Sequence, residues 1–183
     1  MCVSRSLLFV CTANMLRSPS AELLARARGA EAAGWRVSSS GTQALAGRHI
    51  DEDAGRALQA YGISPFEHRA RQTTPQLLRE ADLVVTFEIR HRQWVLEQEP
   101  SLAGRVLTIR RVVSLLVAKP RRADPLDHLR WDAHPYGPTD EFADPVGSGL
   151  DTIVRTVAEI DRLLGVLLPS IGAVPPSGAR TGE

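Results

Sequence analysis

Short apolar segments alternate with helical segments between residues 7 and 109 of the sequence. The apolar segments have the length of strands, and they predict four of them, over residues 7–10, 35–39, 83–87 and 106–109. Strands that alternate with helices form a parallel sheet with right-handed connections, and the helices then cover both of its faces. The alternation therefore predicts an α/β fold, in which a single domain is built around a four-stranded parallel sheet.

The helical segments are marked by apolar spacing and by residues typical of helix ends. The first helix is expected from Pro19 to near Gly34, because proline in the first turn lacks only an N–H that would have no partner there. The other helices are expected over residues 51–61, 74–80, 89–98 and 150–168. Residues 120–145 contain five prolines and are predicted to form a long loop.

The end of the domain is expected at residue 168. Beyond it, residues 169–183 are rich in proline, serine and glycine, a composition that buries too little apolar surface to fold. The sequence therefore predicts one domain over residues 1–168 and a disordered tail over residues 169–183.

The composition excludes several classes of partner and site. With 22 Lys and Arg against 21 Asp and Glu, the net charge of +1 provides no field to hold a nucleic acid or an anionic membrane. No apolar run is long enough to span a membrane, and the two cysteines, Cys2 and Cys11, are too few for a disulfide scaffold or a thiolate zinc site. We therefore expect a cytoplasmic protein with no metal and no cofactor. Four histidines show no metal-ligand spacing and are interpreted as surface or core residues: His49, His91, His128 and His134.

One loop carries the residues for phosphate chemistry. Cys11 follows the first predicted strand, and Arg17 stands six positions later where the first helix begins. A loop of this length can point its backbone N–H groups inward at the positive end of the helix dipole, which forms an anion site. Arg17 can close that site, because a guanidinium offers two parallel N–H donors to two phosphoryl oxygens. The loop residues expected to bind phosphate are Thr12, Ala13, Asn14, Met15, Leu16, Arg17 and Ser18.

The same loop favours a reactive Cys11. A thiol at a helix N-terminus beside an arginine is favoured in its thiolate form, which is a nucleophile. Ser18 can donate its hydroxyl to that thiolate, and Asn14 tolerates the left-handed backbone that a tight loop needs. Cys11 is therefore the candidate nucleophile.

Residues 10–19, Val-Cys-Thr-Ala-Asn-Met-Leu-Arg-Ser-Pro, resemble the signature loop of the low molecular weight protein tyrosine phosphatases. Further stretches follow the order of that family over about residues 5–168: Ser40-Gly41-Thr42, Gly47, Asp51, His68-Arg69-Ala70-Arg71-Gln72, Ala81-Asp82-Leu83 and Asp144-Pro145. Residues 41–51 are most similar to the bacterial subgroup that regulates exopolysaccharide synthesis.

The resemblance implies a function and partners. It implies a cytoplasmic, metal-free enzyme that hydrolyses phosphotyrosine in proteins through a cysteinyl-phosphate intermediate. A tyrosine kinase of polysaccharide export is then among its expected protein substrates. Residues 68–71 could organise the rim of the site in such an enzyme, or could form a solvated charged turn.

The resemblance also places a general acid in an Asp-Pro pair. Asp144-Pro145 matches it, because the pair lies just before the last predicted helix, whereas Asp124-Pro125 is a rival earlier in the loop. Leu45 and Val146 are the expected substrate rim. Val146 stands where the family commonly has an aromatic residue, so we expect Trp131 or Tyr136 to contact the substrate ring instead, unless both merely pack the loop onto the sheet.

Other departures from the family leave alternatives open. Leu16 replaces a second loop cysteine found in many members, which excludes a disulfide within the loop. An arsenate reductase would use the same loop and thiolate, but here it would need an external thiol, since no cysteine follows Cys11. A non-enzymatic phosphate-binding module would need neither Cys11 nor Asp144.

Overall fold

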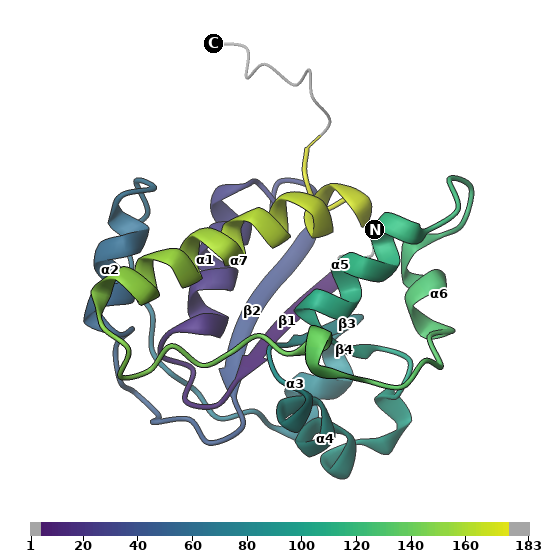
Figure 1. The fold of residues 1–183 in the computed structure, drawn as a ribbon, viewed down its shortest axis with the longest axis horizontal. Coiled ribbons are helices and arrows are strands. Elements are labelled where there is room, and N and C mark those ends of the chain that lie inside the picture. Colours follow the sequence, from purple (N-terminus) through teal and green to yellow (C-terminus); the bar gives the residue numbers. More distant parts are fainter. Residues whose placement is uncertain (1–4, 176–183) are drawn as a thin grey trace.

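The computed structural model describes residues 5–175 and contains the predicted four-stranded parallel sheet. Its strands are β1 (Arg5–Cys11), β2 (Trp35–Gly41), β3 (Leu83–Thr86) and β4 (Val106–Thr108), in the order β2-β1-β3-β4 (Figure 1). Every neighbouring pair is parallel. The predicted α/β fold is confirmed.

Helices connect the strands and complete the domain. They are α1 (Arg17–Ala27), α2 (Glu52–Gln59), α3 (Pro75–Glu80), α4 (Ile89–Gln98), α5 (Ile109–Ala118), α6 (Pro125–Arg130) and α7 (Leu150–Ser170). Two short 3₁₀ turns, η1 (Pro100–Leu102) and η2 (Pro138–Asp140), lie in the connections. None of the helices between residues 5 and 175 is long and apolar enough to cross a membrane.

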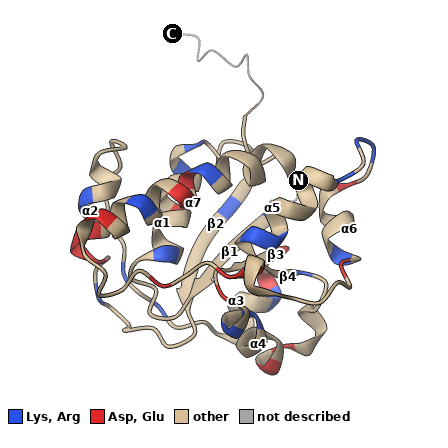
Figure 2. Ribbon diagram, viewed as in Figure 1, with Lys and Arg blue, Asp and Glu red and all other residues tan. Residues whose placement is uncertain are grey.

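The alternating side chains of β1 divide the core into two layers. Leu7 and Phe9 point to the face that α1, α5 and α7 cover, whereas Leu8 and Val10 point to the face covered by α3 and α4 (Figure 1). Because both faces are covered, the central strand is apolar and buried from Leu7 to Cys11, as expected of a buried parallel strand. Acidic and basic residues are interspersed over the surface elements (Figure 2).

The predicted loop over residues 120–145 is wrong in part, because it contains α6 and η2. Asp124 accepts hydrogen bonds from the backbone N–H groups of Leu126 and Asp127, and Pro125 occupies the first turn. Leu126 and Leu129 are buried on one side of this short helix. Two of the five prolines that indicated a loop, Pro125 and Pro138, therefore mark the starts of these helices. Residue 109 likewise begins α5 and does not end a strand.

The expected end of the domain at residue 168 is also wrong. The helix α7 continues through Pro169 to Ser170, since a proline there removes only its own N–H bond near the helix end. Ile171 and Ala173 are buried, and the Ala173 N–H donates to the Leu168 carbonyl at 2.7 Å. Residues 169–175 therefore pack on the domain. The rest of the expected tail, residues 176–183, and Cys2 lie outside the described residues.

We predict that Asp124→Ala lowers the free energy of unfolding by about 1 kcal/mol, because the variant loses the side-chain cap of α6. Urea denaturation measures this as a lower midpoint at an unchanged slope. Asp124→Asn is the control, because asparagine caps helices about as well as aspartate. An alanine variant as stable as the wild type would show that the cap contributes nothing.

Candidate functional site

The loop between β1 and α1 lies where the order of the strands reverses. After β1 the chain forms β2 on one side of this strand and later forms β3 on its other side. The connections on the two sides of β1 therefore leave in opposite directions. Ligands of open α/β sheets bind in the crevice at the carboxyl ends of the strands at this point. The predicted loop is therefore at the position of the sheet that favours a binding site.

The backbone of this loop presents free donors. No backbone N–H from Thr12 to Leu16 donates to an acceptor in the part of the chain that the structure describes. Backbone N–H groups away from water are almost always paired, so a row of unpaired ones requires a ligand or solvent acceptor. Successive N–H groups at the start of a helix bind anions. The predicted anion site thus has its donors in place.

Asn14 holds the loop in shape from behind. It is fully buried and has a positive φ of 57°, the left-handed conformation predicted for it. Its amide nitrogen donates to Ser18 Oγ and to Ser39 Oγ, both at 2.9 Å, and its Oδ1 accepts the Arg71 N–H at 2.9 Å. The Asn14 carbonyl contacts His68 Nε2 at 2.8 Å. Residues 68–71 therefore brace the loop and are more than a solvated turn.

Cys11 lies under the loop at the end of β1 and is buried. Its Sγ is 3.0 Å from Ser18 Oγ. Because Ser18 Oγ accepts from the Asn14 amide, its own hydrogen is left for Cys11 Sγ or for the Ser40 carbonyl at 3.2 Å. A charged acceptor gives the stronger hydrogen bond, so a thiolate would attract that hydrogen. The geometry agrees with the role expected of Ser18.

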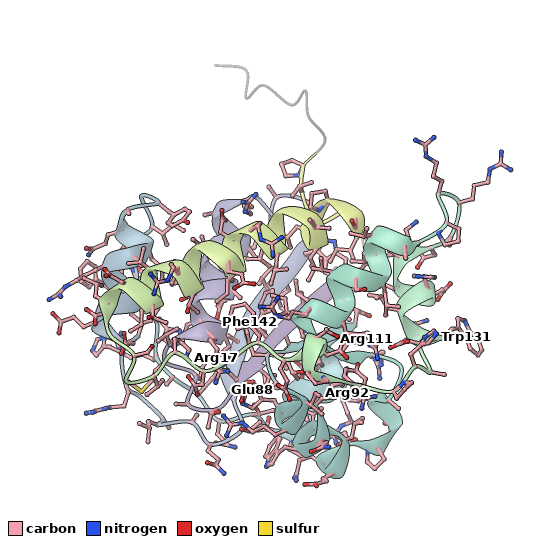
Figure 3. All side chains as sticks on the ribbon, viewed as in Figure 1. Arg17, Glu88, Arg92, Arg111, Trp131 and Phe142 are labelled. Atoms are coloured by element: carbon pink, nitrogen blue, oxygen red, sulfur yellow. The ribbon has the colours of Figure 1, made fainter. Side chains whose placement is uncertain are left out.

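Arg17 is 2% exposed and is held by groups from two distant segments. Its Nη1 donates to Glu88 Oε2 at 2.6 Å and to the Phe142 carbonyl at 3.1 Å. Its Nη2 donates to Asp144 Oδ2 at 2.7 Å. Figure 3 shows Arg17, Glu88 and Phe142 grouped at the centre of the molecule. The two carboxylates supply the compensation that a buried cation needs.

Phe142 fixes the segment that carries Asp144. Its ring is buried and meets the ring of Phe87 edge to face, with centroids 5.5 Å apart. Its N–H donates to the Phe87 carbonyl at 2.9 Å. Asp144 is placed two residues further on, with its side chain 31% exposed. Asp144 therefore lies at the site, whereas its rival Asp124 caps α6.

Cys11, Arg17 and Asp144 line a cavity of about 340 Å³. Asp51, whose side chain caps α2, also lines it. The expected rim residues also line it: Leu45 is 53% exposed and Val146 is 72% exposed. The predicted loop residues that line the cavity are Thr12, Ala13, Met15, Leu16 and Arg17.

The expectation that Trp131 or Tyr136 contacts the substrate ring is wrong, because neither lines this cavity. Trp131 is 85% exposed and projects from the outer side of α6 (Figure 3). The guanidinium groups of Arg92 and Arg111 both lie over the Tyr136 ring. Their Cζ atoms are 4.4 and 4.6 Å from the ring centroid. Cation–π contacts of this kind pack the loop onto the domain, which was the alternative for Tyr136.

Glu88 and His91, at the start of α4, lie beside the site, although neither was predicted from the sequence to belong to it. His91 is 2% exposed, and its Nε2 is 2.8 Å from Thr12 Oγ1. Burial, reinforced by the positive charge of Arg17, lowers the pKa of His91 to about 4. Burial raises the pKa of Glu88, but hydrogen bonds from Arg90 and Arg17 outweigh it, and the pKa is lowered overall. A signal was available, since both residues follow the carboxyl end of β3.

The other predicted histidines lie outside the candidate site. His128 contacts the Leu115 carbonyl, and His49 and His134 are exposed. Residues 5–175 contain no group of three or more His, Cys, Asp or Glu side chains that could hold a metal ion. The residues that face the cavity are instead suited to an anion, a nucleophile and a proton donor.

Gly41 lets β2 approach the loop closely. A Cβ at this position would lie 2.3 Å from the Thr12 carbonyl oxygen and 2.9 Å from the Asn14 nitrogen. Such distances are impossible without moving the backbone. Glycine is therefore required at the point where β2 supports the loop.

The sequence is similar to those of known phosphatases. Residues 6–128 match a family described as low molecular weight phosphotyrosine protein phosphatase. The low molecular weight protein-tyrosine-phosphatase Wzb of Salmonella typhimurium is 36% identical over 101 residues, which are 55% of this chain and 66% of Wzb. Wzb of Escherichia coli K12 is 35% identical over 102 residues, 56% of this chain and 67% of that protein.

Solved structures share the fold. A low molecular weight protein tyrosine phosphatase from T. tengcongensis is 28% identical, with a TM-score of 0.73 over 91% of this chain and 99% of its own. The YwlE arginine phosphatase, solved as a cysteine-to-serine mutant with a phosphorylated active site serine, is 26% identical, with a TM-score of 0.72 over 91% of this chain and 95% of its own. The AmsI tyrosine phosphatase of Erwinia amylovora, at 23% identity and a TM-score of 0.71 over 92% and 93% of the two chains, supports the fold alone.

We predict that Gly41→Ala weakens the binding of vanadate or inorganic phosphate at least 10-fold, because the new Cβ would push the loop carbonyl of Thr12 away and turn the N–H donors. Isothermal titration calorimetry measures the affinity. Gly165→Ala in α7 is the matched control, since a Cβ there meets only the flexible side chain of Arg28 at an ordinary distance. Equal affinities in the two variants would contradict the close-approach argument.

Proposed function

Because the chain belongs to the low molecular weight phosphotyrosine protein phosphatase family, we propose that it hydrolyses phosphotyrosine in proteins through a cysteinyl-phosphate on Cys11. Arg17 binds and orients the phosphoryl group, and Asp144 is the general acid. The observation that carries the proposal is that Cys11, Arg17 and Asp144 line one cavity of about 340 Å³, although Asp144 is distant in sequence.

Binding of the substrate exchanges one anion for another at Arg17. The guanidinium now donates to Asp144 through Nη2 and to Glu88 through Nη1. A phosphoryl group in the loop takes the donor that Asp144 occupies, while Glu88 keeps the guanidinium in place. Asp144 is then free to turn towards the leaving oxygen. Arg17 is thus oriented before the substrate arrives, which lowers the cost of ordering it during catalysis.

The first chemical step transfers the phosphoryl group. The Cys11 thiolate forms a bond to phosphorus as the bond between phosphorus and the phenolic oxygen breaks. Asp144, which takes up a proton from solvent once it has left Arg17, gives that proton to the phenolic oxygen, so the leaving group departs as a neutral phenol. The free N–H groups of residues 12–16 and Arg17 stabilise the charge on the phosphoryl oxygens in the transition state.

The second step releases phosphate. The Asp144 carboxylate accepts a proton from a water molecule, and the resulting hydroxide attacks phosphorus as the bond between sulfur and phosphorus breaks. The thiolate leaves with the electron pair, and the Ser18 hydroxyl, 3.0 Å away, can stabilise it. The structurally similar YwlE mutant carries a phosphorylated active site serine in place of a cysteine, which supports the proposal that Cys11 carries the phosphoryl group here.

The rim favours a flat apolar group beside the loop. Leu45 and Val146 stand exposed on the wall of the cavity and can contact a phenyl ring, in place of the aromatic residue expected from the family. A lone valine is a weaker wall than an aromatic ring, so we propose that tyrosine preference rests on Leu45 and Val146 together.

The alternatives are less well supported. An arsenate reductase would need a thiol from another molecule, because Cys11 is the only cysteine in the described part of the chain. A module that only binds phosphate would have no use for Asp144 at the mouth of the cavity. Because the structurally similar YwlE is an arginine phosphatase, phosphoarginine is a further substrate to compare with phosphotyrosine.

We further propose that the protein acts in the cytoplasm and dephosphorylates a bacterial tyrosine kinase of polysaccharide export. The support is the similarity of residues 41–51 to the exopolysaccharide-regulating subgroup and the identity shared with the Wzb proteins. Dephosphorylation of such a kinase by the purified protein, followed with an antibody to phosphotyrosine, tests this step.

We predict that Cys11→Ser abolishes turnover of p-nitrophenyl phosphate and phosphotyrosine but leaves phosphate or vanadate binding detectable, because the loop donors and Arg17 remain. Initial rates are measured with phosphotyrosine, phosphoserine, phosphoarginine and arsenate. The proposal expects the highest kcat/KM on phosphotyrosine. More than a trace of activity in the variant, or a faster reaction on phosphoarginine or arsenate, would contradict it.

We predict that Asp144→Asn lowers kcat/KM, which reports the transfer of the phosphoryl group to Cys11, by about 10² to 10⁴ with a poor leaving group such as phenol, and much less with p-nitrophenol, which departs without protonation. Asp124→Asn is the matched control, because it keeps the cap of α6 and lies outside the cavity. An equal loss with both leaving groups would show that Asp144 does not act as the general acid.

A further inference from the structure

A second polar network joins α4 to the residue that follows the nucleophile. Thr12 Oγ1 lies 2.8 Å from His91 Nε2 and 3.5 Å from Arg90 Nη2. His91 Nδ1 lies 3.2 Å from the backbone nitrogen of Glu88. The site described above uses the backbone of Thr12 and assigns no role to its hydroxyl or to His91.

The directions of these hydrogen bonds follow from chemistry. A backbone N–H can only donate, so His91 Nδ1 must accept from Glu88 and carries no proton. A neutral imidazole then has its proton on Nε2, which donates to Thr12 Oγ1. The low pKa of His91, caused by burial and by Arg17, keeps the ring neutral across the physiological range. Arg90 is also a donor.

The Thr12 hydroxyl therefore accepts from its protein neighbours and has its own hydrogen to give. Among residues 5–175, no acceptor for that hydrogen lies within hydrogen-bond distance. Thr12 lines the cavity beside Cys11 and Arg17. A donor that has no protein acceptor, in a cavity whose other donors are built for an anion, points to an oxygen of the bound ligand.

We propose that the Thr12 hydroxyl donates a hydrogen bond to a non-bridging phosphoryl oxygen of the substrate, and that His91 is the positioning residue that holds it in the donor role. The inference rests on the proposed function and adds a side-chain donor to the backbone donors of the loop. No proton is transferred. The Thr12 hydrogen bond strengthens as negative charge grows on the phosphoryl oxygens.

The charged groups around His91 support this role. The positive charges of Arg17 from α1 and Arg90 from α4 both lower the pKa of His91, and the Glu88 carboxylate, which raises it, lies 3.5 Å from Nε2. Glu88 also holds Arg17, so one short segment orients both ends of the phosphate loop. Thr12 and Arg17 are thereby positioned by two residues of the same helix start, His91 and Glu88.

The first test removes the hydroxyl while keeping the shape. Thr12→Val should lower kcat/KM for p-nitrophenyl phosphate about 10-fold and weaken vanadate binding by a similar factor, the range for losing a hydrogen bond to a charged group. Thr12→Ser, which keeps the hydroxyl, should stay within about twofold of the wild type. Thermal denaturation of each variant checks that the fold is intact.

The second test asks whether His91 acts through Thr12. His91→Leu should lower kcat/KM several-fold in the wild-type background, and clearly less when Thr12→Val is already present, because the two residues serve one hydrogen bond. His91→Gln, whose amide can still donate, should recover part of the loss. His128→Leu is the matched control, since His128 contacts only the Leu115 carbonyl away from the cavity.

The outcomes separate this inference from the proposed function. Wild-type hydrolysis of phosphotyrosine together with unchanged kcat/KM and vanadate affinity in Thr12→Val would overturn the inference and leave the function standing. A loss in Thr12→Ser as large as in Thr12→Val would also overturn it, because the effect would then come from packing. Should the wild type hydrolyse none of the substrates, vanadate affinity still decides the role of Thr12. If His91→Leu does not fold, the Thr12 pair decides alone.

Discussion

The buried guanidinium of Arg17 sets a requirement that the rest of the site meets. A cation removed from water is stable only when carboxylates and hydrogen bonds compensate it. Glu88 comes from the end of β3 and Asp144 from the loop before α7, and both reach the same side chain. Phe142 adds its carbonyl oxygen and packs its ring on Phe87. The charge of one residue thus draws the β3–α4 connection and the loop before α7 to the mouth of the β1–α1 loop, which is how the site is assembled.

Buried polar side chains hold the β1–α1 loop from behind through hydrogen bonds. Asn14, Ser18 and Ser39 are buried, and the Asn14 amide donates to both serine hydroxyls. Each would be unfavourable if left unpaired, so the network tolerates only one arrangement of the loop. The same arrangement leaves the N–H groups of residues 12–16 without protein acceptors. Rigidity on one side of the loop therefore maintains open donors on the other.

Much of this site could be predicted from local sequence, and the rest depends on the fold. The spacing of Cys11 and Arg17 between a strand and a helix was sufficient, because the chemistry there is confined to one loop. Asp144 was identified by resemblance and by its place before the last helix. Glu88 and His91 were missed because their partners are some 70 to 80 residues away and no local pattern pairs them. The ring contact expected of Trp131 was wrong, since proximity in sequence to Val146 did not reveal that α6 turns the indole outward.

The contact between Arg17 and Asp144 joins residues 127 positions apart. During synthesis from the N-terminus, Cys11 and Arg17 emerge early, but the carboxylate that completes the site emerges only shortly before α7. That helix covers α1, α2 and α5, so the domain is not closed until it is made. A growing chain therefore carries Cys11 and Arg17 before it has the proton donor, which is also the second carboxylate that holds Arg17, and the site is complete only once the segment before α7 is made. The order of the residues along the chain makes catalysis a property of the finished domain.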